Sequence, residues 1–510
     1  MNINDKQRNY GKSMLILAII ACCSKVFGFL RDIVLTNVYG ASSIADAYLI
    51  TLSIPDMILE LLANTIMVGF VPIAVSKLAN SSEELNEFTT STSKILVILG
   101  LIFSSILALF PKQILTLLAP GFGIEEGKFA ISFLRVLSFT IVFKTLSSVL
   151  HAYLNSTKFF TPSAFLGVLL DFSIIIAIIF SKKLNYVNLL PFGALFGTFL
   201  QSIYLIPFAR KKGFKLLLKS KIKWEEMKHL FIMSIPALLS IGLMHISSLY
   251  NKALATAMGE GSVTLFNHSS RISFFVENII VSSIATVLYP LLSEYYIAGE
   301  KDKIKSTLSD SIEKAITFLL PATVGLFLLS QPIIDVLYGN GAFTSENVLI
   351  TSKLMRINVL GIVGITIQTL LTRAMFSMKK VKVSIIMSIT LLAFYLGSSY
   401  LFSKLLDLNG LAIATAISYS VGGIAYYIVI NKVCGNINVK STVTVLLKAV
   451  IASFIMGSVI YIFNYFVNIS QIVKLVLSVI IGVVLYALMA KVLHLTQFDI
   501  KAILKKKKNS

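Results

Sequence analysis

The sequence predicts an all-helical membrane protein that crosses the bilayer many times, and two observations carry this prediction. Of its 510 residues, 56% are hydrophobic and only 14% are charged, whereas about a quarter of the residues in soluble domains are charged. The apolar residues also gather in runs of about 20 or more, the length that a helix needs to cross a bilayer. We therefore expect a polytopic membrane protein.

About fourteen such runs can be drawn. Pro55, Pro72 and Pro290 fall inside two long ones, where a proline kinks or ends a helix. The predicted transmembrane helices lie near residues 14–38, 45–75, 93–110, 129–154, 162–180, 188–209, 228–249, 263–292, 311–330, 348–376, 383–403, 410–431, 442–466 and 470–493.

The net charge of +21 does not indicate a nucleic-acid partner, because Lys and Arg gather between the apolar runs. Cytoplasmic loops of membrane proteins carry such an excess. Placing both termini in the cytoplasm puts the basic segments 210–228, 301–305, 379–382 and 501–508 inside. The opposite loops then hold little beyond Lys112, Lys128, Lys182, Lys183, Lys252 and Lys404.

Segment 210–228 admits two interpretations. With Trp224 as an interfacial anchor, it is an amphipathic connector on anionic lipid. It is equally well a charge cluster that only sets topology.

The three cysteines form no disulfide framework and no metal-ligand spacing, so we expect neither a metal nor a cofactor.

The two halves of the chain resemble each other. Leu134-Arg135 aligns with Met355-Arg356, and Pro111 with Pro332, at a separation of 221 residues. Six helices per copy give both copies the same orientation, as in two-lobed transporters. We predict a first lobe over residues 1–209, a basic linker over 210–228, a second lobe over 229–431, and two further helices with a basic tail over 432–510.

Charges inside the predicted spans follow this repeat. An ionisable group at bilayer depth costs about 3 kcal/mol and usually faces a bundle interior or a watery cavity. Structural ion pairs between helices are one interpretation, and a central cavity for an anionic group is the other. The repeat-related placement favours the cavity. The charges are Lys25, Arg31, Asp32, Asp46, Asp56, Glu60, Arg135 and Lys144 in the first lobe, and His245, His268, Arg271, Glu277 and Arg356 in the second, with Asp171 apart.

Among these residues, Arg31 and Arg271 are the best anion ligands, because a guanidinium binds phosphate in bidentate fashion. Asp32 can hold Arg31 in place, and Asp171 and Glu277 suit partners within one lobe. His268 is either a proton-linked switch or a hydrogen-bonded helix residue.

The motifs resemble those of a known family. Ser24-Lys25-Val26-Phe27-Gly28-Phe29-Leu30-Arg31-Asp32 resembles the Ser-Arg-x-x-Gly-Phe-x-Arg-Asp opening of the MurJ (MviN) lipid II flippases. Ala45-Asp46-Ala47-Tyr48 resembles their Thr-Asp-Ala-Phe step, and Gly261-Ser262-Val263-Thr264 with Ser270-Arg271 resembles their eighth span. The resemblance covers the entire chain. The wider multidrug/oligosaccharidyl-lipid/polysaccharide flippase superfamily shares the plan of two six-helix lobes plus two C-terminal helices.

The resemblance implies a substrate-binding set of Lys25, Arg31, Asp32, Asp46, Thr264 and Arg271, to which we add Arg135 and Arg356. The chain also departs from the family. Leu59 stands at a family arginine and is followed by Glu60, Phe274 replaces an acidic residue, and Lys25 replaces an arginine. We expect Arg135, Lys144 or Arg356 to supply the missing positive charge.

The implied function is translocation of an undecaprenyl-pyrophosphate-linked peptidoglycan precursor, lipid II, to the outer leaflet by alternating access. Two alternatives are a flippase for another polyprenyl-linked saccharide, from capsule, exopolysaccharide or teichoic-acid synthesis, and a drug or cation antiporter. An enzyme is disfavoured, because the predicted outer loops carry neither His nor Cys. The implied partners are a lipid-linked saccharide pyrophosphate and membrane lipids, and cell-wall synthesis proteins are compatible with the resemblance. No nucleic acid is expected.

Overall fold

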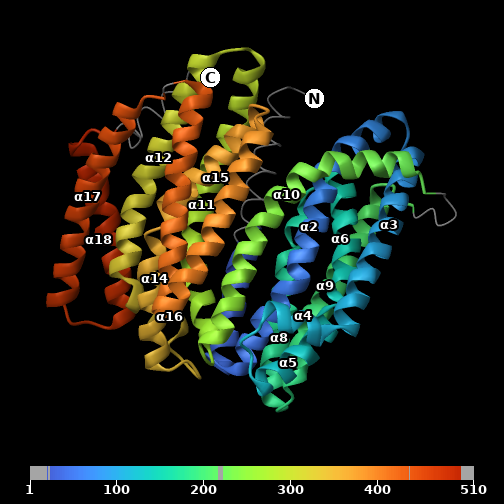
Figure 1. Cartoon of the computed structure of the whole chain (residues 1–510), viewed down its shortest axis with the longest axis horizontal. Helices are drawn as coiled ribbons and strands as arrows, with labels where there is room; N and C mark the ends of the chain where they lie inside the picture. The colour runs from blue at the N-terminus through green and yellow to red at the C-terminus, as the bar shows by residue number, and fades with distance from the viewer. Residues whose placement is uncertain (1–19, 21–22, 216–221, 436, 496–510) are drawn as a thin grey trace. The chain divides into compact units, whose positions relative to one another are not determined.

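The computed structural model describes residue 20 and residues 23–215, 222–435 and 437–495 (Figure 1). Within these ranges every regular element is a helix, so the predicted all-helical class is confirmed. By their contacts the residues divide into two compact units. The first unit holds residues 1–264 and 341–343, and the second holds 265–340 and 344–510.

The first unit is built around α2 (Ser43–Asn80), a 38-residue helix of about 57 Å at 1.5 Å per residue. It packs against α3, α5, α6 and α10. The other helices of this unit are residues 23–39, α3 (Ser82–Leu109), α4 (Pro111–Leu118), α5 (Ile124–Leu137), α6 (Thr140–Ser156), α7 (Thr161–Ala164), α8 (Leu166–Lys183), η1 (Val187–Leu189), α9 (Leu190–Lys211), α10 (Trp224–Ala255) and η2 (Thr256–Met258).

Burial of apolar side chains holds this unit together. Phe70 of α2 and Phe88 of α3 are fully buried and stack with ring centroids 5.0 Å apart. Leu154 of α6 and Leu205 of α9 belong to the same cluster. Where these helices lie in the membrane, such side chains stabilise the packed state through van der Waals contacts, because lipid is as apolar as they are.

The second unit continues from α11 and ends with α17 and α18. Met456 of α17 and Tyr486 of α18 share a buried cluster with Leu329, and the Tyr486 hydroxyl donates to the Thr317 carbonyl at 2.6 Å. The C-terminal pair therefore packs on α12. The helices are α11 (Ser262–Ile297), α12 (Lys301–Leu328), α13 (Ser330–Tyr338), α14 (Ser345–Val359), α15 (Ile362–Ser377), α16 (Val381–Cys434), α17 (Val439–Phe466) and α18 (Gln471–Val492).

The long α16 is a hairpin of two helices rather than one rod. Its backbone is non-helical at Leu406 and Asp407. The Tyr395 hydroxyl lies 3.3 Å from Thr415 Oγ1, and the pair formed by Ser388 and Tyr426 lies further from the turn on both sides. This spacing is that of antiparallel neighbours, as the two predicted spans 383–403 and 410–431 require.

The backbone repeats with the separation found in the sequence. Lys158 and Lys379, which lie 221 residues apart, both have positive φ, 59° and 57°. The helices before them, α6 and α15, end at Ser156 and Ser377, which have the same separation. Positive φ is uncommon for a residue with a Cβ atom, so its recurrence supports the predicted pseudo-symmetric halves.

The described helices fit a protein that crosses the membrane many times. Nine helical segments are long and apolar enough to span it when α5–α6, α7–α8 and η1–α9 each count as one, or ten if the bent pair α14 and α15 forms one span. The hairpin α16 counts once in this total, which refers to the described residues. A count of fourteen is compatible with these helices and stays a prediction.

Several boundaries differ from the predicted ones for identifiable reasons. The third predicted span began at residue 93, whereas α3 begins at Ser82, where the Ser81 side chain accepts a hydrogen bond from the Glu84 backbone. Polar first turns were not visible to a search for apolar runs. Of the two outcomes expected at Pro55 and Pro72, an early helix end is ruled out, because α2 continues through both, and a kink stays a prediction.

The domain boundaries at 209 and 229 are not decided by these contacts. Helix α10 packs along α2 and so falls in the first compact unit, whereas the repeat assigns it to the second lobe. The compact units are defined by contacts between residues, whereas the predicted lobes are defined by the repeat in the sequence. The units therefore do not test the lobes, which stay a prediction.

Candidate functional site

A polar stripe runs along α2 in the first unit. Ser53, Asp56 and Glu60 occupy positions i, i+3 and i+7 of this helix, a spacing that places three side chains on one helical face. The stripe begins ten residues after the helix start, about 15 Å along its axis. It therefore lies well inside the predicted second span.

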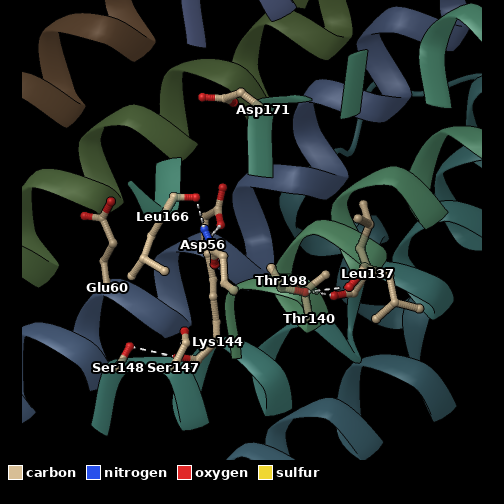
Figure 2. Close-up of polar contacts among 12 residues, drawn as sticks. Asp56, Glu60, Leu137, Thr140, Lys144, Ser147, Ser148, Leu166, Asp171 and Thr198 are labelled. Atoms are coloured by element: carbon tan, nitrogen blue, oxygen red, sulfur yellow. Dashed lines mark hydrogen bonds and ion pairs between the residues drawn. The ribbon is translucent and has the colours of Figure 1, made fainter. Parts of the chain in front are cut away.

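Each member of the stripe meets a basic side chain of a neighbouring helix. Lys252 Nζ of α10 donates to Ser53 Oγ at 2.6 Å. Lys144 of α6 forms an ion pair with Asp56, and His245 of α10 contacts Glu60. Figure 2 shows the Lys144 side chain reaching from its helix to Asp56, with Glu60 nearby. Three helices thus combine acidic and basic groups on one surface.

This surface is partly open. The Asp56 and Glu60 side chains are 41% and 55% exposed, and those of Lys144 and His245 are 26% and 27% exposed. Charges inside a membrane span are expected to face a bundle interior or a water-filled cavity. The polar stripe is therefore suited to contact a polar ligand.

Arg31 is held much more tightly. Its Nη1 donates to Asp171 Oδ1 of α8 at 2.7 Å, and its Nη2 donates to Asp32 Oδ1 at 3.0 Å. The three side chains are 15%, 11% and 1% exposed. These charged hydrogen bonds fix the guanidinium of Arg31 in position. Asp32 holds Arg31 in place, as predicted, and Asp171 lies in the same compact unit as Arg31.

Asp46 and Thr264 contact each other. Asp46 Oδ1 accepts hydrogen bonds from the Thr264 backbone at 2.8 Å and from the Thr264 hydroxyl, and Oδ2 accepts from the Val263 backbone at 3.3 Å. Both side chains are buried. Because Val263 and Thr264 lie in the first turn of α11, Asp46 acts as the acceptor for otherwise unpaired N–H groups at a helix start. This contact favours a structural role for the two residues.

In the second unit, Arg356 Nε donates to Ser330 Oγ at 2.8 Å. Two residues further on, Asn358 Nδ2 donates to Ser270 Oγ at 3.3 Å. This bond places α14 beside the part of α11 that carries the half-buried Arg271. The predicted ligands Arg271 and Arg356 therefore lie on neighbouring helices of one unit.

The remaining predicted ligands lie at open positions. Lys25 is exposed on helix 23–39, and Arg135 is exposed near the end of α5. At the position where the resemblance places an arginine, Leu59 is buried at 3% exposure, and its neighbour Glu60 points to the open surface. The charged residues of α2 next to Leu59 are the acidic Asp56 and Glu60, and the nearby basic groups come from α6 and α10.

His268 is fully buried and stacks on Tyr338 with ring centroids 4.5 Å apart. This geometry shows a packed residue, and it decides neither the proton-linked switch nor the hydrogen-bonded helix residue, which both stay predictions. The contact with Tyr338 needs no change of protonation.

Sequence reasoning missed two features of the polar stripe. It assigned Lys252 to an outer loop, which is wrong, because Lys252 lies in the last turn of α10 and contacts Ser53. It also left Asp56, Glu60 and His245 out of the candidate ligands. The i, i+3, i+7 spacing on α2 was a usable signal, but the partners on α6 and α10 depend on tertiary packing.

The basic segment after α9 meets acidic groups at one end of the unit. Lys223 Nζ donates to Glu87 Oε2 at 2.6 Å, and Lys77 of α2 pairs with Glu226 of α10 at 2.7 Å. The Glu87 hydrogen bond raises the pKa of Lys223 above its usual value, so this ammonium stays charged at neutral pH. Trp224, 69% exposed, begins α10, whereas residues 216–221 of the segment lie outside the described ranges.

A family model described as "Lipid II flippase MurJ" matches residues 35–482. The chain belongs to the MurJ lipid II flippase family. The family resemblance inferred from the motifs is therefore confirmed, and the match covers the polar stripe, Asp46, Thr264, Arg271 and Arg356. Membership also places the chain among multi-pass membrane transporters.

Relatives within the MurJ family match over most of their length. The chain is 25% identical over 493 residues to the probable lipid II flippase MurJ of Thermotoga maritima, an alignment that covers 96% of this chain and 98% of the relative. It is 26% identical over 383 residues to the corresponding protein of Buchnera aphidicola from Acyrthosiphon pisum, covering 74% of this chain and 75% of the relative.

Solved structures share the fold. A lipid II flippase MurJ in an inward closed conformation superimposes with a TM-score of 0.81 at 23% identity, covering 94% of this chain and 98% of that one. An inward-facing multidrug transporter of the MATE family gives 0.72 at 16% identity, covering 82% and 98%. The predicted all-helical membrane fold is therefore confirmed.

Proposed function

We infer that this chain is a lipid II flippase, which moves the lipid-linked peptidoglycan precursor from the inner to the outer leaflet by alternating access. The observation that carries the inference is family membership over residues 35–482. Charged groups inside the spans support it, because a pyrophosphate-linked saccharide needs a polar route through an apolar protein.

The proposed contacts to substrate separate into two groups. Arg31 and Arg271 are proposed to bind the pyrophosphate, with Lys25, Arg135 and Arg356 as further basic residues and Asp32 as the group that orients Arg31. The Arg31 clamp supports this assignment by fixing one guanidinium. Asp46 and Thr264 are proposed to act by holding the start of α11 rather than by touching the substrate.

The proposed setting is the bacterial cytoplasmic membrane, with both termini in the cytoplasm. The basic segment near residues 210–215 and the paired Lys223 support this orientation, since positive charge gathers in cytoplasmic loops. An inside-negative potential favours outward movement of an anion.

Cell-wall synthesis proteins are the proposed protein partners, and we expect no catalytic step by the chain itself.

Complementation tests the proposed function. Bacteria depleted of their own lipid II flippase should grow when they express this chain, and an inserted Arg31→Ala variant should not support growth. Lysis despite normal insertion of the unaltered chain would refute the lipid II assignment. Export of another polyprenyl-linked saccharide would then be the next function to test.

A further inference from the structure

The ion pairs inside the first unit differ in how firmly they hold their basic residue. Arg31 is clamped by two carboxylates that are 1% and 11% exposed. Lys144 meets the carboxylate of Asp56, which is 41% exposed, and is itself 26% exposed. Lys144 is thus a basic residue at span depth that a ligand can reach and whose carboxylate partner can move away.

A partly exposed pair of this kind adds little to stability, because solvent and side-chain entropy offset its attraction. A pyrophosphate competes well for the same ammonium, since its two phosphates together carry more charge than one carboxylate and offer several acceptor oxygens. Exchange of Asp56 for a phosphate therefore needs no rearrangement of the helices. The carboxylate also keeps Lys144 compensated when no ligand is present.

The surroundings of Lys144 suit such a ligand. Lys252 donates to Ser53, which precedes Asp56 by one helical turn, about 5 Å along the axis of α2. Two ammonium groups at neighbouring turns match a ligand with two adjacent phosphates. The hydroxyls of Ser147 and Ser148 donate to the Lys144 carbonyl at 2.9 and 2.8 Å (Figure 2), so they do not compete for its ammonium.

We propose that Lys144 is a phosphate-binding residue of the transport site and that Asp56 is its displaceable counter-ion. The proposal rests on the inferred lipid II function and adds to it a residue that selects the pyrophosphate of the carrier lipid. Lys144 leaves Asp56 when the pyrophosphate enters and returns to it when the pyrophosphate leaves. No covalent step is involved.

The competing explanation is a structural salt bridge that joins α2 to α6. The two explanations differ in what they predict for Asp56. A structural pair loses as much from Asp56→Asn as from Lys144→Ala, and the double variant recovers part of the loss. A displaceable counter-ion opposes binding, so Asp56→Asn preserves or strengthens it, and the double variant behaves like Lys144→Ala.

Binding to the purified full-length protein in nanodiscs distinguishes them, with undecaprenyl pyrophosphate and lipid II as probes. Lys144→Ala should weaken binding of both probes by about ten- to hundredfold, the effect of losing a charged hydrogen bond. Lys144→Arg should restore most of it, and Asp56→Asn should bind at least as tightly as the unaltered protein. Lys77→Ala, which removes a lysine of similar exposure that pairs with the less exposed Glu226, is the control and should bind normally.

Equal weakening by Lys144→Ala and Asp56→Asn, with recovery in the double variant, would overturn the proposal, as would a protein that binds neither probe. Normal binding by Lys144→Ala in a protein that flips lipid II would refute the proposal and leave the inferred function intact. Lys144-dependent binding of undecaprenyl pyrophosphate without lipid II transport would refute the inferred substrate and leave the proposed site intact. Thermal unfolding of each variant separates loss of binding from loss of fold.

Discussion

The charged residues inside the predicted spans form two groups that differ in their burial. Arg31, Asp32 and Asp171 form a compact clamp with little exposure, whereas Asp56 and Glu60 lie on an open face of α2. A buried charge left without its partner is costly, but an exposed one is solvated at little cost. The two groups should therefore respond differently to substitution.

The Arg31 clamp gives the first prediction. Asp171→Asn removes a charged partner of the guanidinium, and breaking a buried pair typically costs about 3 kcal/mol. We expect a lower melting temperature in detergent and reduced transport. Glu60→Gln, which alters an exposed carboxylate, should change the melting temperature much less, and equal destabilisation by the two variants would contradict the distinction.

Asp46 gives the second prediction, at the start of α11. Asp46→Ala removes the acceptor for two backbone N–H groups and a hydroxyl, and losing such a helix cap costs about 1–2 kcal/mol. Asp46→Asn keeps an acceptor oxygen and should cost less. Hydrogen exchange at Val263 and Thr264 measures the effect directly, and unchanged protection in Asp46→Ala would show that the cap does not hold this turn.

At the scale of elements, the α16 hairpin depends on a close approach between its two arms. A Cβ atom on Gly410 would lie 1.8 Å from the Phe402 carbonyl oxygen, whereas one on Gly397 in the same element would meet nothing within 4 Å. Gly410→Ala should therefore force the turn open and lower the yield of folded protein. Gly397→Ala should be neutral or slightly stabilising, since Ala favours a helix by about 1 kcal/mol over Gly, and similar behaviour of the two variants would refute the tight turn.

The elements themselves were largely predictable because a bilayer imposes length and apolar character on every span. The fifth and sixth predicted spans, 162–180 and 188–209, lie within three residues of the ends of α7–α8 and η1–α9. The short helices α4 and α13 were not predicted, because each is shorter than a span. The partners of Asp56 and Glu60, and the pairing of Asp171 with Arg31, were not predictable either, since they depend on which faces of α6, α8 and α10 turn toward α2 and helix 23–39.

At the scale of the whole molecule, the loop charges predict which side of the membrane each segment faces. A protein without its three native cysteines and with Lys215→Cys should react with a membrane-impermeant thiol reagent only after the cells are opened. With Glu125→Cys instead, it should react in intact cells. Both positions are exposed, and labelling of both from the same side would overturn the predicted orientation.

The measurement that tests the central claim most directly follows lipid II itself. Cells depleted of their own flippase accumulate lipid II on the inner leaflet, where an added enzyme that cleaves lipid II and cannot cross the membrane does not reach it. Expression of this chain should make lipid II cleavable from outside, and expression of Arg31→Ala at an equal level should not. Lipid II that stays protected in cells holding the correctly inserted, unaltered chain would contradict the account.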